Sequence, residues 1–160
     1  MIEMLRESLI ASAFSLAVTS GVAAKPQPGT ATIAGSWQLN TKASKVLVPM
    51  KSATRVYTVV GNRVTMLANG IEASGKTVSL SFAAAFDGKF YPIVGNPLWD
   101  TIAISKVDAH TFTAVLRKGS AVSATSRTIL SRDGNHLTIT NKIGTPPGKL
   151  VTTTLVFDRK

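Results

Sequence analysis

The sequence predicts an all-β fold: an antiparallel up-and-down meander of about nine or ten strands that closes into a barrel. Thr and Val are abundant and only 16% of the residues are charged, a composition that favours strands over helices. After Ile33, turn signals recur about every ten residues, which is the spacing of short strands in a barrel or sandwich. Consecutive hairpins without a long crossover indicate a meander, and closure into a barrel removes its edges.

The first half of the predicted barrel contains five strands. Asp87-Gly88 is its strongest hairpin signal, because this pair suits the backbone of a two-residue turn. Pro92 is expected to end the strand that contains it, since proline cannot donate a hydrogen bond to a ladder. A connector over residues 42–50 follows the first strand. The expected strands cover residues 35–40, 53–60, 63–69, 77–86 and 89–93.

The second half begins after Asn96-Pro97, which interrupts the strand pattern. Short pairs of residues that contain Asp, Gly or Ser provide the turns. A Gly-Thr-Pro-Pro-Gly loop over residues 144–148 makes the last connection. The expected strands here cover residues 100–107, 111–118, 121–131, 136–143 and 150–157.

The N-terminus differs in composition from the rest of the chain. An apolar run ends in Val22-Ala23-Ala24, with small residues where a signal peptidase cleaves, so residues 1–24 are interpreted as a signal peptide. Residues 25–32 form a linker, and residues 33–160 form a single domain. A membrane anchor is the alternative, but the run is shorter than the ~20 apolar residues of a spanning helix. The expected location is the bacterial periplasm or the exterior.

The charge is strongly basic, with a formal net charge of +10 for the whole chain. Such a domain attracts polyanions. For an exported protein, anionic envelope polymers or lipid headgroups are more plausible partners than nucleic acid, and no stable membrane insertion is expected after cleavage. The alternative is that scattered lysines solvate the strand faces and prevent edge-to-edge aggregation.

Alternation along the expected strands predicts which side chains line the interior. Phe82, Phe86 and their apolar neighbours share one face of residues 77–86, and Tyr57 shares a face with Arg55. Asn141 lies among the apolar side chains of residues 136–143. An interior with a few polar groups is typical of a ligand-binding barrel. In residues 150–157, both faces carry apolar side chains, so the sequence does not decide which face points inward.

Gly35-Ser36-Trp37 at the start of a secreted β-meander resembles the Gly-x-Trp signature of the lipocalins and their calycin relatives. The resemblance implies that Trp37 plugs the closed end of a barrel and that a basic side chain packs across it; Arg159 and Arg127 are the candidates. The wider pattern GSWQLN, FDGKFYPIVGNPLWDT and ATSRTILSRDGNHLTIT resembles small exported bacterial lipocalin-like proteins, and it covers nearly all of residues 25–160.

Catalytic chemistry has little support in the sequence. The chain has two histidines and no cysteine. His110 and His136 follow turns at one end of the expected barrel, so a metal site between them is a minor hypothesis. Asp87 and Asp100 flank the segment FDGKFYPIVGNPLWD and could meet as a carboxylate pair, although Asp commonly serves turn geometry at such positions. No catalytic residue, metal ligand or cofactor is therefore expected.

The predicted function is that of an exported, non-catalytic protein that holds a small apolar or amphipathic molecule in the barrel. Leu98 and Trp99 lie at the barrel mouth, either contacting a ligand with Phe90 and Tyr91 or simply capping the core. Arg55 or Arg127 would pair with an acidic headgroup. One alternative is a basic envelope protein with a solid core that binds anionic polymers; another is a hydrolase or metal enzyme. The expected ligand-binding residues are Tyr57, Phe82, Phe86, Tyr91, Trp99 and Arg127.

Overall fold

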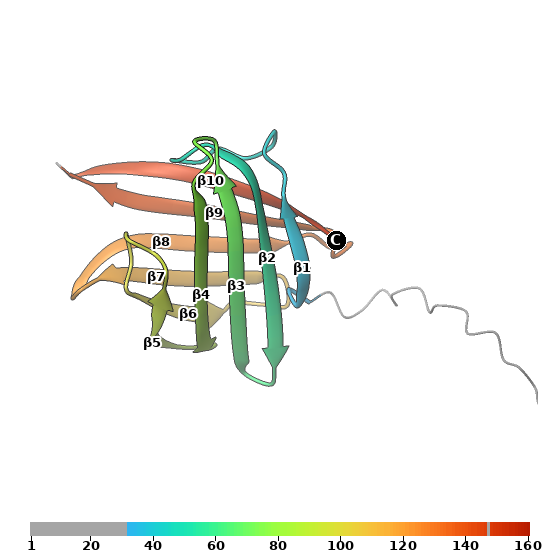
Figure 1. Ribbon diagram of the computed structural model, residues 1–160. Coiled ribbons are helices and arrows are strands. Elements are labelled where there is room, and N and C mark those ends of the chain that lie inside the picture. The colour runs from blue at the N-terminus through green and yellow to red at the C-terminus, as the bar shows by residue number, and fades with distance from the viewer. Residues whose placement is uncertain (1–31, 147) are drawn as a thin grey trace, which may run out of the picture.

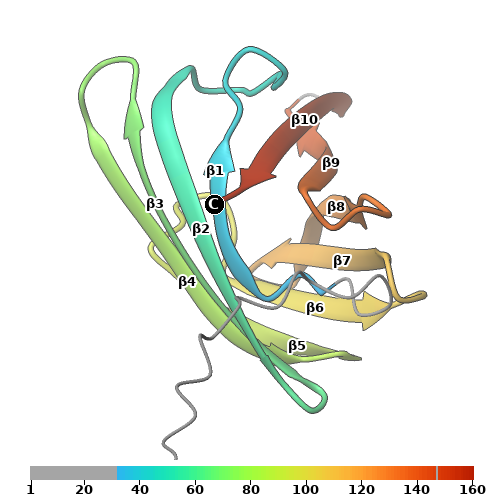
Figure 2. The ribbon, with the colours of Figure 1, turned by 90° about the vertical axis from the view of Figure 1, so that its right-hand side faces the viewer.

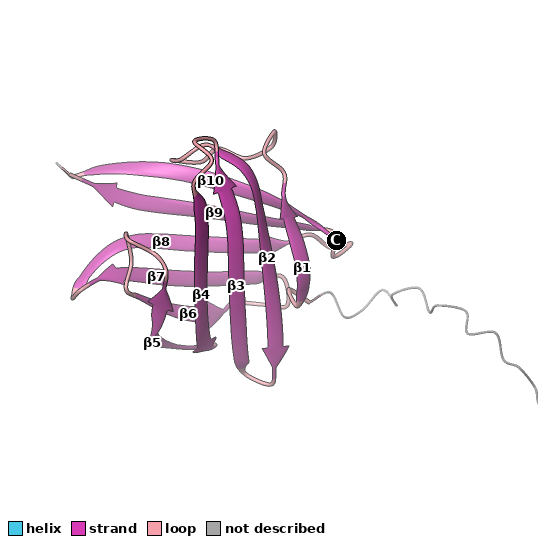
Figure 3. Cartoon of the chain, viewed as in Figure 1, coloured by secondary structure: helices cyan, strands magenta, loops and turns pink. Residues whose placement is uncertain are grey.

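The computed structural model describes residues 32–146 and 148–160. The predicted signal peptide and nearly all of the predicted linker lie outside the described residues. In the described part the chain is all-β, without helices, and ten antiparallel strands close into an up-and-down barrel in the order β1-β10-β9-β8-β7-β6-β5-β4-β3-β2 (Figures 1 and 3). The predicted fold class is thus confirmed.

Strand bounds agree with the sequence expectation to within a few residues at most ends. The largest extensions are three residues each: the second strand begins earlier than expected, at Met50, and the third strand ends later than expected, at Glu72. The strands are β1 (Gly35–Leu39), β2 (Met50–Val60), β3 (Arg63–Glu72), β4 (Thr77–Ala85), β5 (Asp87–Val94), β6 (Thr101–Lys106), β7 (Thr111–Lys118), β8 (Ala121–Leu130), β9 (His136–Thr145) and β10 (Lys149–Arg159).

The barrel closes through its first strand. Trp37 lies opposite Arg159 on β10 and opposite Arg55 on β2, so β1 has a hydrogen-bonded neighbour on each side. β2, β3 and β4 cross β7–β10 at a steep angle, which gives the barrel two nearly orthogonal walls (Figures 1 and 2). All ten ladders lie within the described residues, so the domain needs no further segment to pair its edges.

The corner between the two walls differs from the expectation. Asp87-Gly88 is not a two-residue hairpin: Asp87 already pairs with Ser105 on β6, and the register shifts before Phe90. Gly88 has φ 73°, a left-handed conformation suited to a β-bulge. The β4–β5 ladder is reduced to Ser81↔Val94 and Phe82↔Ile93, because the chain uses the bulge to turn the corner.

Pro92 also behaves differently from the expectation. β5 continues beyond it to Val94, and the Ile93 N–H donates to the Asp100 carbonyl at 2.8 Å. Pro92 lies opposite Thr101 in the β5–β6 ladder. Proline loses only its own N–H, so a strand continues where the adjacent donor still finds an acceptor.

Several of the most completely buried side chains lie at the end of the barrel that holds Trp37. Its indole is 0% exposed, and Leu137 and Phe157 pack in the same buried cluster. The Trp37 Nε1–H donates to the Ile33 carbonyl at 2.9 Å, which satisfies the buried indole nitrogen. On β10, Thr153 and Phe157 are buried, so this is the strand's inward face.

Arg159 closes the same end from outside the core. Its guanidinium lies 4.3 Å from the centre of the Trp37 ring, so the expected basic side chain across the tryptophan is present and is Arg159. An added Cβ at Gly35, where φ is 127°, would lie 2.6 Å from Arg159 Nη1. The positive φ favours glycine at position 35, and the missing Cβ leaves room for the guanidinium in this place.

Candidate functional site

The opposite end of the barrel, hereafter the mouth end, opens into a cavity of about 450 Å³. Its walls come from the connector over residues 46–48, from the loop over residues 95–99, and from the ends of β2, β3, β4, β9 and β10 that face this side. The apolar lining includes Met50, Leu80 and Leu155. A space of this size lies within the range of small-molecule sites, about 300–1,000 Å³.

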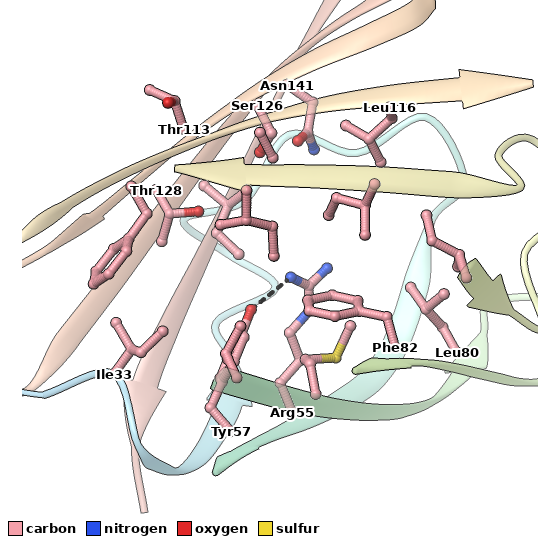
Figure 4. A pocket seen from close by; sticks show the side chains of 18 of the residues that line it. Ile33, Arg55, Tyr57, Leu80, Phe82, Thr113, Leu116, Ser126, Thr128 and Asn141 are labelled. Atoms are coloured by element: carbon pink, nitrogen blue, oxygen red, sulfur yellow. Dashed lines mark hydrogen bonds between the residues drawn. The ribbon is translucent and has the colours of Figure 1, made fainter. Parts of the chain in front are cut away.

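A smaller inner cavity of about 100 Å³ continues from the mouth cavity toward the core. It contains a few polar side chains among many aliphatic and aromatic ones, and Thr113, Ser126 and Thr128 supply hydroxyl groups (Figure 4). Arg55, Leu80, Trp99 and Asn141 line both spaces. The two cavities are thus adjacent, and these four side chains lie between them.

Arg55 is the cation at the junction of the two cavities. Its Nη1–H donates to the Tyr57 hydroxyl at 3.2 Å (Figure 4), and its guanidinium lies 4.9 Å from the centre of the Phe157 ring. Within residues 32–146 and 148–160, no carboxylate lies within 4 Å of it, because the two ion pairs found there join Lys118 to Asp100 and His136 to Asp158. The positive charge therefore has polar and aromatic neighbours but no acidic partner.

Trp99 is placed over the interior by the loop that precedes it. The Asn96 Oδ1 accepts hydrogen bonds from the backbone N–H of Leu98 at 2.7 Å and of Trp99 at 3.2 Å. Gly95, with φ 85°, packs against the Ser79 carbonyl so closely that a Cβ would overlap it. Trp99 is half-buried against the core, whereas Leu98 remains 52% exposed.

The structure brings four of the six expected ligand-binding residues to the cavity. Tyr57, Phe82, Phe86 and Trp99 all line the inner space. The other two, Tyr91 and Arg127, do not line the inner or the mouth cavity.

Tyr91 instead serves the corner of the barrel. It packs on the core, and its hydroxyl donates to Asp87 Oδ2 at 2.9 Å. This bond raises the pKa of the Tyr91 phenol, and the Lys89 backbone N–H is the main cause that lowers the pKa of the Asp87 carboxyl. Phe90, which was also expected to contact a ligand, packs against Arg117 instead. The Arg117 guanidinium carbon lies 3.6 Å from the centre of the Phe90 ring.

Arg127 is exposed and alternates with the cavity-lining Ser126 and Thr128 on β8, so it lies on the outer face. It neither packs across Trp37 nor reaches the cavity. Arg55, which the sequence offered only as an alternative to Arg127, is the inward cation. The wall at residues 46–48 was missed, although three apolar residues in a connector, Val46-Leu47-Val48, were a usable signal.

The structure does not assemble the carboxylate pair. Asp87 lies opposite Ser105, while the Asp100 carbonyl bonds to Ile93 at the other end of the β5–β6 ladder. The Asp100 carboxylate accepts from Lys118 Nζ at 2.9 Å and from the Gly119 N–H at 2.8 Å, and the Lys118 bond is the main cause that lowers its pKa.

The two histidines are engaged separately. His110 Nδ1 lies 3.1 Å from the Leu130 carbonyl, and His136 Nδ1 lies 2.8 Å from Asp158 Oδ1. Within the described chain, no three His, Asp or Glu side chains are grouped so that they could hold a metal ion. Neither histidine faces the cavity.

A scan of protein-family models and a search of curated proteins found no match to this chain. The described residues contain no helix of the length and hydrophobicity that would let it span a membrane. The resemblance to lipocalin-like proteins accordingly stays a prediction, and the cavity itself is the basis for a functional proposal.

Proposed function

We propose that this protein is an exported, non-catalytic carrier of a small amphipathic molecule with an acidic headgroup. The headgroup pairs with Arg55, and the apolar body occupies the mouth cavity. The observation that carries this proposal is Arg55 itself, a cation without an acidic partner in the described chain that lines an otherwise largely apolar cavity.

The energetic reason is the cost of an uncompensated charge near an apolar interior. Partly buried charges are normally paired, because desolvation disfavours a lone ion. The Tyr57 hydroxyl and the Phe157 ring offset part of this cost for Arg55. An anionic headgroup would add charge-assisted hydrogen bonds, which are roughly twice as strong as neutral ones and often bidentate with arginine.

The dimensions fit this orientation. The inner cavity of about 100 Å³ is too small for a whole drug-sized ligand, whereas the mouth cavity is about 450 Å³. A ligand with its headgroup at Arg55 would extend its apolar body outward between Leu80, Trp99 and Leu155. The mouth cavity also weakens the alternative of a solid-core protein, which would offer no such space.

Two fluorescent probes with nearly the same skeleton test the headgroup. 8-Anilinonaphthalene-1-sulfonate carries an anionic group, and N-phenyl-1-naphthylamine lacks it. Both are titrated into residues 25–160 and into the Arg55→Met variant, which keeps the apolar stem. Loss of one charged hydrogen-bonding partner costs about 1.5–3 kcal/mol, so we expect the sulfonate to bind roughly 10–100-fold more weakly to the variant.

The neutral probe is the control, and its affinity should change by less than about threefold. Equal losses for both probes would mean that the substitution damages the cavity rather than the charge site. Unchanged binding of both would sink the headgroup assignment. Native mass spectrometry of residues 25–160, purified without detergent, would supplement the titration by showing any co-purified small molecule.

A further inference from the structure

We propose that the mouth end of the barrel docks on anionic phospholipid bilayers, so that the ligand cavity opens onto the membrane surface. The purpose of this docking would be ligand exchange with the membrane, and that part rests on the proposed function. The docking itself rests on a separate observation. That observation is the distribution of charge and exposed apolar side chains between the two ends of the barrel.

Because neighbouring strands are antiparallel, successive connections alternate between the two ends of the barrel. The mouth end comprises residues 40–51, 71–77, 94–101, 117–122, 145–146 and 148–149 (Figure 3). The plugged end, which holds Trp37, comprises the termini of the described chain and the other four connections. The segments of the mouth end carry seven basic and two acidic residues: Lys42, Lys45, Lys51, Lys76, Arg117, Lys118 and Lys149 against Glu72 and Asp100.

The plugged end has a different balance. Its six basic and four acidic residues leave a net charge of +2, compared with +5 at the mouth end, and Arg159 is engaged with backbone carbonyls and the Trp37 ring. At the mouth end, only Lys118 forms an ion pair within the described chain. The basic residues of the plugged end are Arg63, Lys89, Lys106, Arg132, Arg159 and Lys160, and its acidic residues are Asp87, Asp108, Asp133 and Asp158.

The mouth end also exposes apolar side chains. Leu47, Val48 and Leu98 are 46%, 50% and 52% exposed. All three line the mouth cavity, so two segments far apart in the sequence, residues 46–48 and the loop over residues 95–99, contribute exposed apolar side chains to one site. Single exposed apolar residues are ordinary on protein surfaces, but a group around a cavity entrance is typical of an interaction site.

Lysines together with exposed apolar side chains favour a lipid surface over a soluble polyanion as the partner. Lysines near an anionic bilayer gain electrostatic attraction, and leucine side chains enter the interfacial region. A soluble polymer would use the lysines but would leave Leu47, Val48 and Leu98 in water. Docking in this orientation places the apolar part of the cavity against the headgroup region, with Arg55 deeper inside.

The test is partitioning of residues 25–160 onto vesicles, measured by sedimentation. Vesicles of phosphatidylcholine with one quarter phosphatidylglycerol are compared with pure phosphatidylcholine at low ionic strength. The mouth-end variant carries Lys45→Glu, Lys51→Glu and Lys76→Glu. The matched variant carries Lys89→Glu, Lys106→Glu and Arg132→Glu at the plugged end; all six side chains are exposed, and both variants change the net charge equally.

We expect anionic vesicles to bind the protein at least tenfold better than neutral ones. Attraction near an anionic membrane corresponds to about a fivefold change in partitioning per lysine, so the mouth-end variant should lose 100-fold or more. The plugged-end variant should lose much less. Equal losses in the two variants, or no binding to anionic vesicles, would overturn the proposal.

A second pair of variants separates lipid from polymer. Leu47→Ser with Leu98→Ser should weaken vesicle binding several-fold, while Val60→Ser with Val107→Ser, which alters exposed residues of the plugged end, should not. If the leucine variant binds vesicles normally and dextran sulfate competes fully, the partner is an anionic polymer and the lipid proposal is wrong. Circular dichroism confirms that each variant is folded.

Tryptophan quenching supplies an orientation measurement. Trp99 lies at the mouth, whereas Trp37 is fully buried at the plugged end. Brominated phospholipid should quench the wild-type emission and leave that of Trp99→Phe nearly unchanged. The vesicle assays measure docking and do not require the cavity to be filled, so they can fail while the probe titrations succeed. Conversely, Arg55→Met should bind vesicles normally even where it loses the anionic probe.

Discussion

Arg159→Met tests the physical account of the plugged end. The arginine contributes a guanidinium 4.3 Å from the centre of the Trp37 ring. It also donates three hydrogen bonds to backbone carbonyls: Nε to Gly134 at 2.6 Å, Nη1 to Ala34 at 2.9 Å and Nη2 to Thr32 at 2.6 Å. Methionine retains much of the aliphatic stem and removes all four interactions.

The expected loss of unfolding free energy is about 3 kcal/mol. The cation–π contact contributes about 1 kcal/mol at a partly buried site. The bonds to Gly134 and Ala34 are partly buried and contribute about 1 kcal/mol each. The bond to Thr32 is exposed, and water replaces it at little net cost. For a domain of this size, the melting temperature should fall by roughly 10 °C.

Urea unfolding followed by fluorescence and circular dichroism measures this loss. Arg132→Met is the matched control, because Arg132 is exposed in the neighbouring turn, and it should change stability by less than about 0.5 kcal/mol. Arg159→Lys should be intermediate, since it keeps the charge but cannot bond to all the carbonyls. If Arg159→Met costs no more than Arg132→Met, the guanidinium is not a closing element of the barrel and the reasoning is wrong.

Two further predictions concern the mouth end. Gly95→Ala and Gly61→Ala both place alanine at positive φ, but only Gly61 has open space for a Cβ. Gly61→Ala should cost about 1–2 kcal/mol of unfolding free energy. Gly95→Ala should cost more and should also weaken probe binding, because the loop that carries Trp99 must move. Equal losses of stability in the two variants, together with normal probe binding, would contradict this. The second prediction concerns the pH dependence of stability. The pKa of the Asp100 carboxyl is lower in the folded than in the unfolded protein. Its contribution to stability is therefore present above the unfolded-state pKa of about 3.9 and is lost as the pH falls through the folded-state pKa. Asp100→Asn should therefore flatten the acid side of a stability–pH curve, and a variant with an unchanged acid side would show that the Lys118 contact does not stabilise the fold.

Much of the cavity could be anticipated from local patterns. Alternation correctly placed Phe82 on the inward face of β4 and Phe86, directly after the strand, on the same side, and it placed Tyr57 and Arg55 together on β2. The same rule put Asn141 inside. Because a strand's side chains alternate strictly between faces, one buried residue determines the orientation of its neighbours.

The corner segment was harder to interpret. Asp87-Gly88 has the composition of a hairpin turn, yet the chain there already pairs with β6. Local composition records which residues tolerate a left-handed backbone, but not which strand lies alongside. Tyr91 illustrates the same limit, because its hydroxyl is taken up by Asp87 instead of facing the cavity.

The sequence by itself determined the all-β class and most of the strand limits, because turn chemistry and side-chain alternation are local properties. For the contact with Trp37 it offered two candidates, Arg159 and Arg127, and the structure shows that Arg159 makes it. Only the tertiary structure decided between Arg55 and Arg127, and only it grouped Leu47, Val48 and Leu98 around one opening. Barrel closure brings residues far apart in the chain to one end, and the strand register decides which of them meet. Cavity shape and charge asymmetry arise from that closure, so they cannot be read from any single segment.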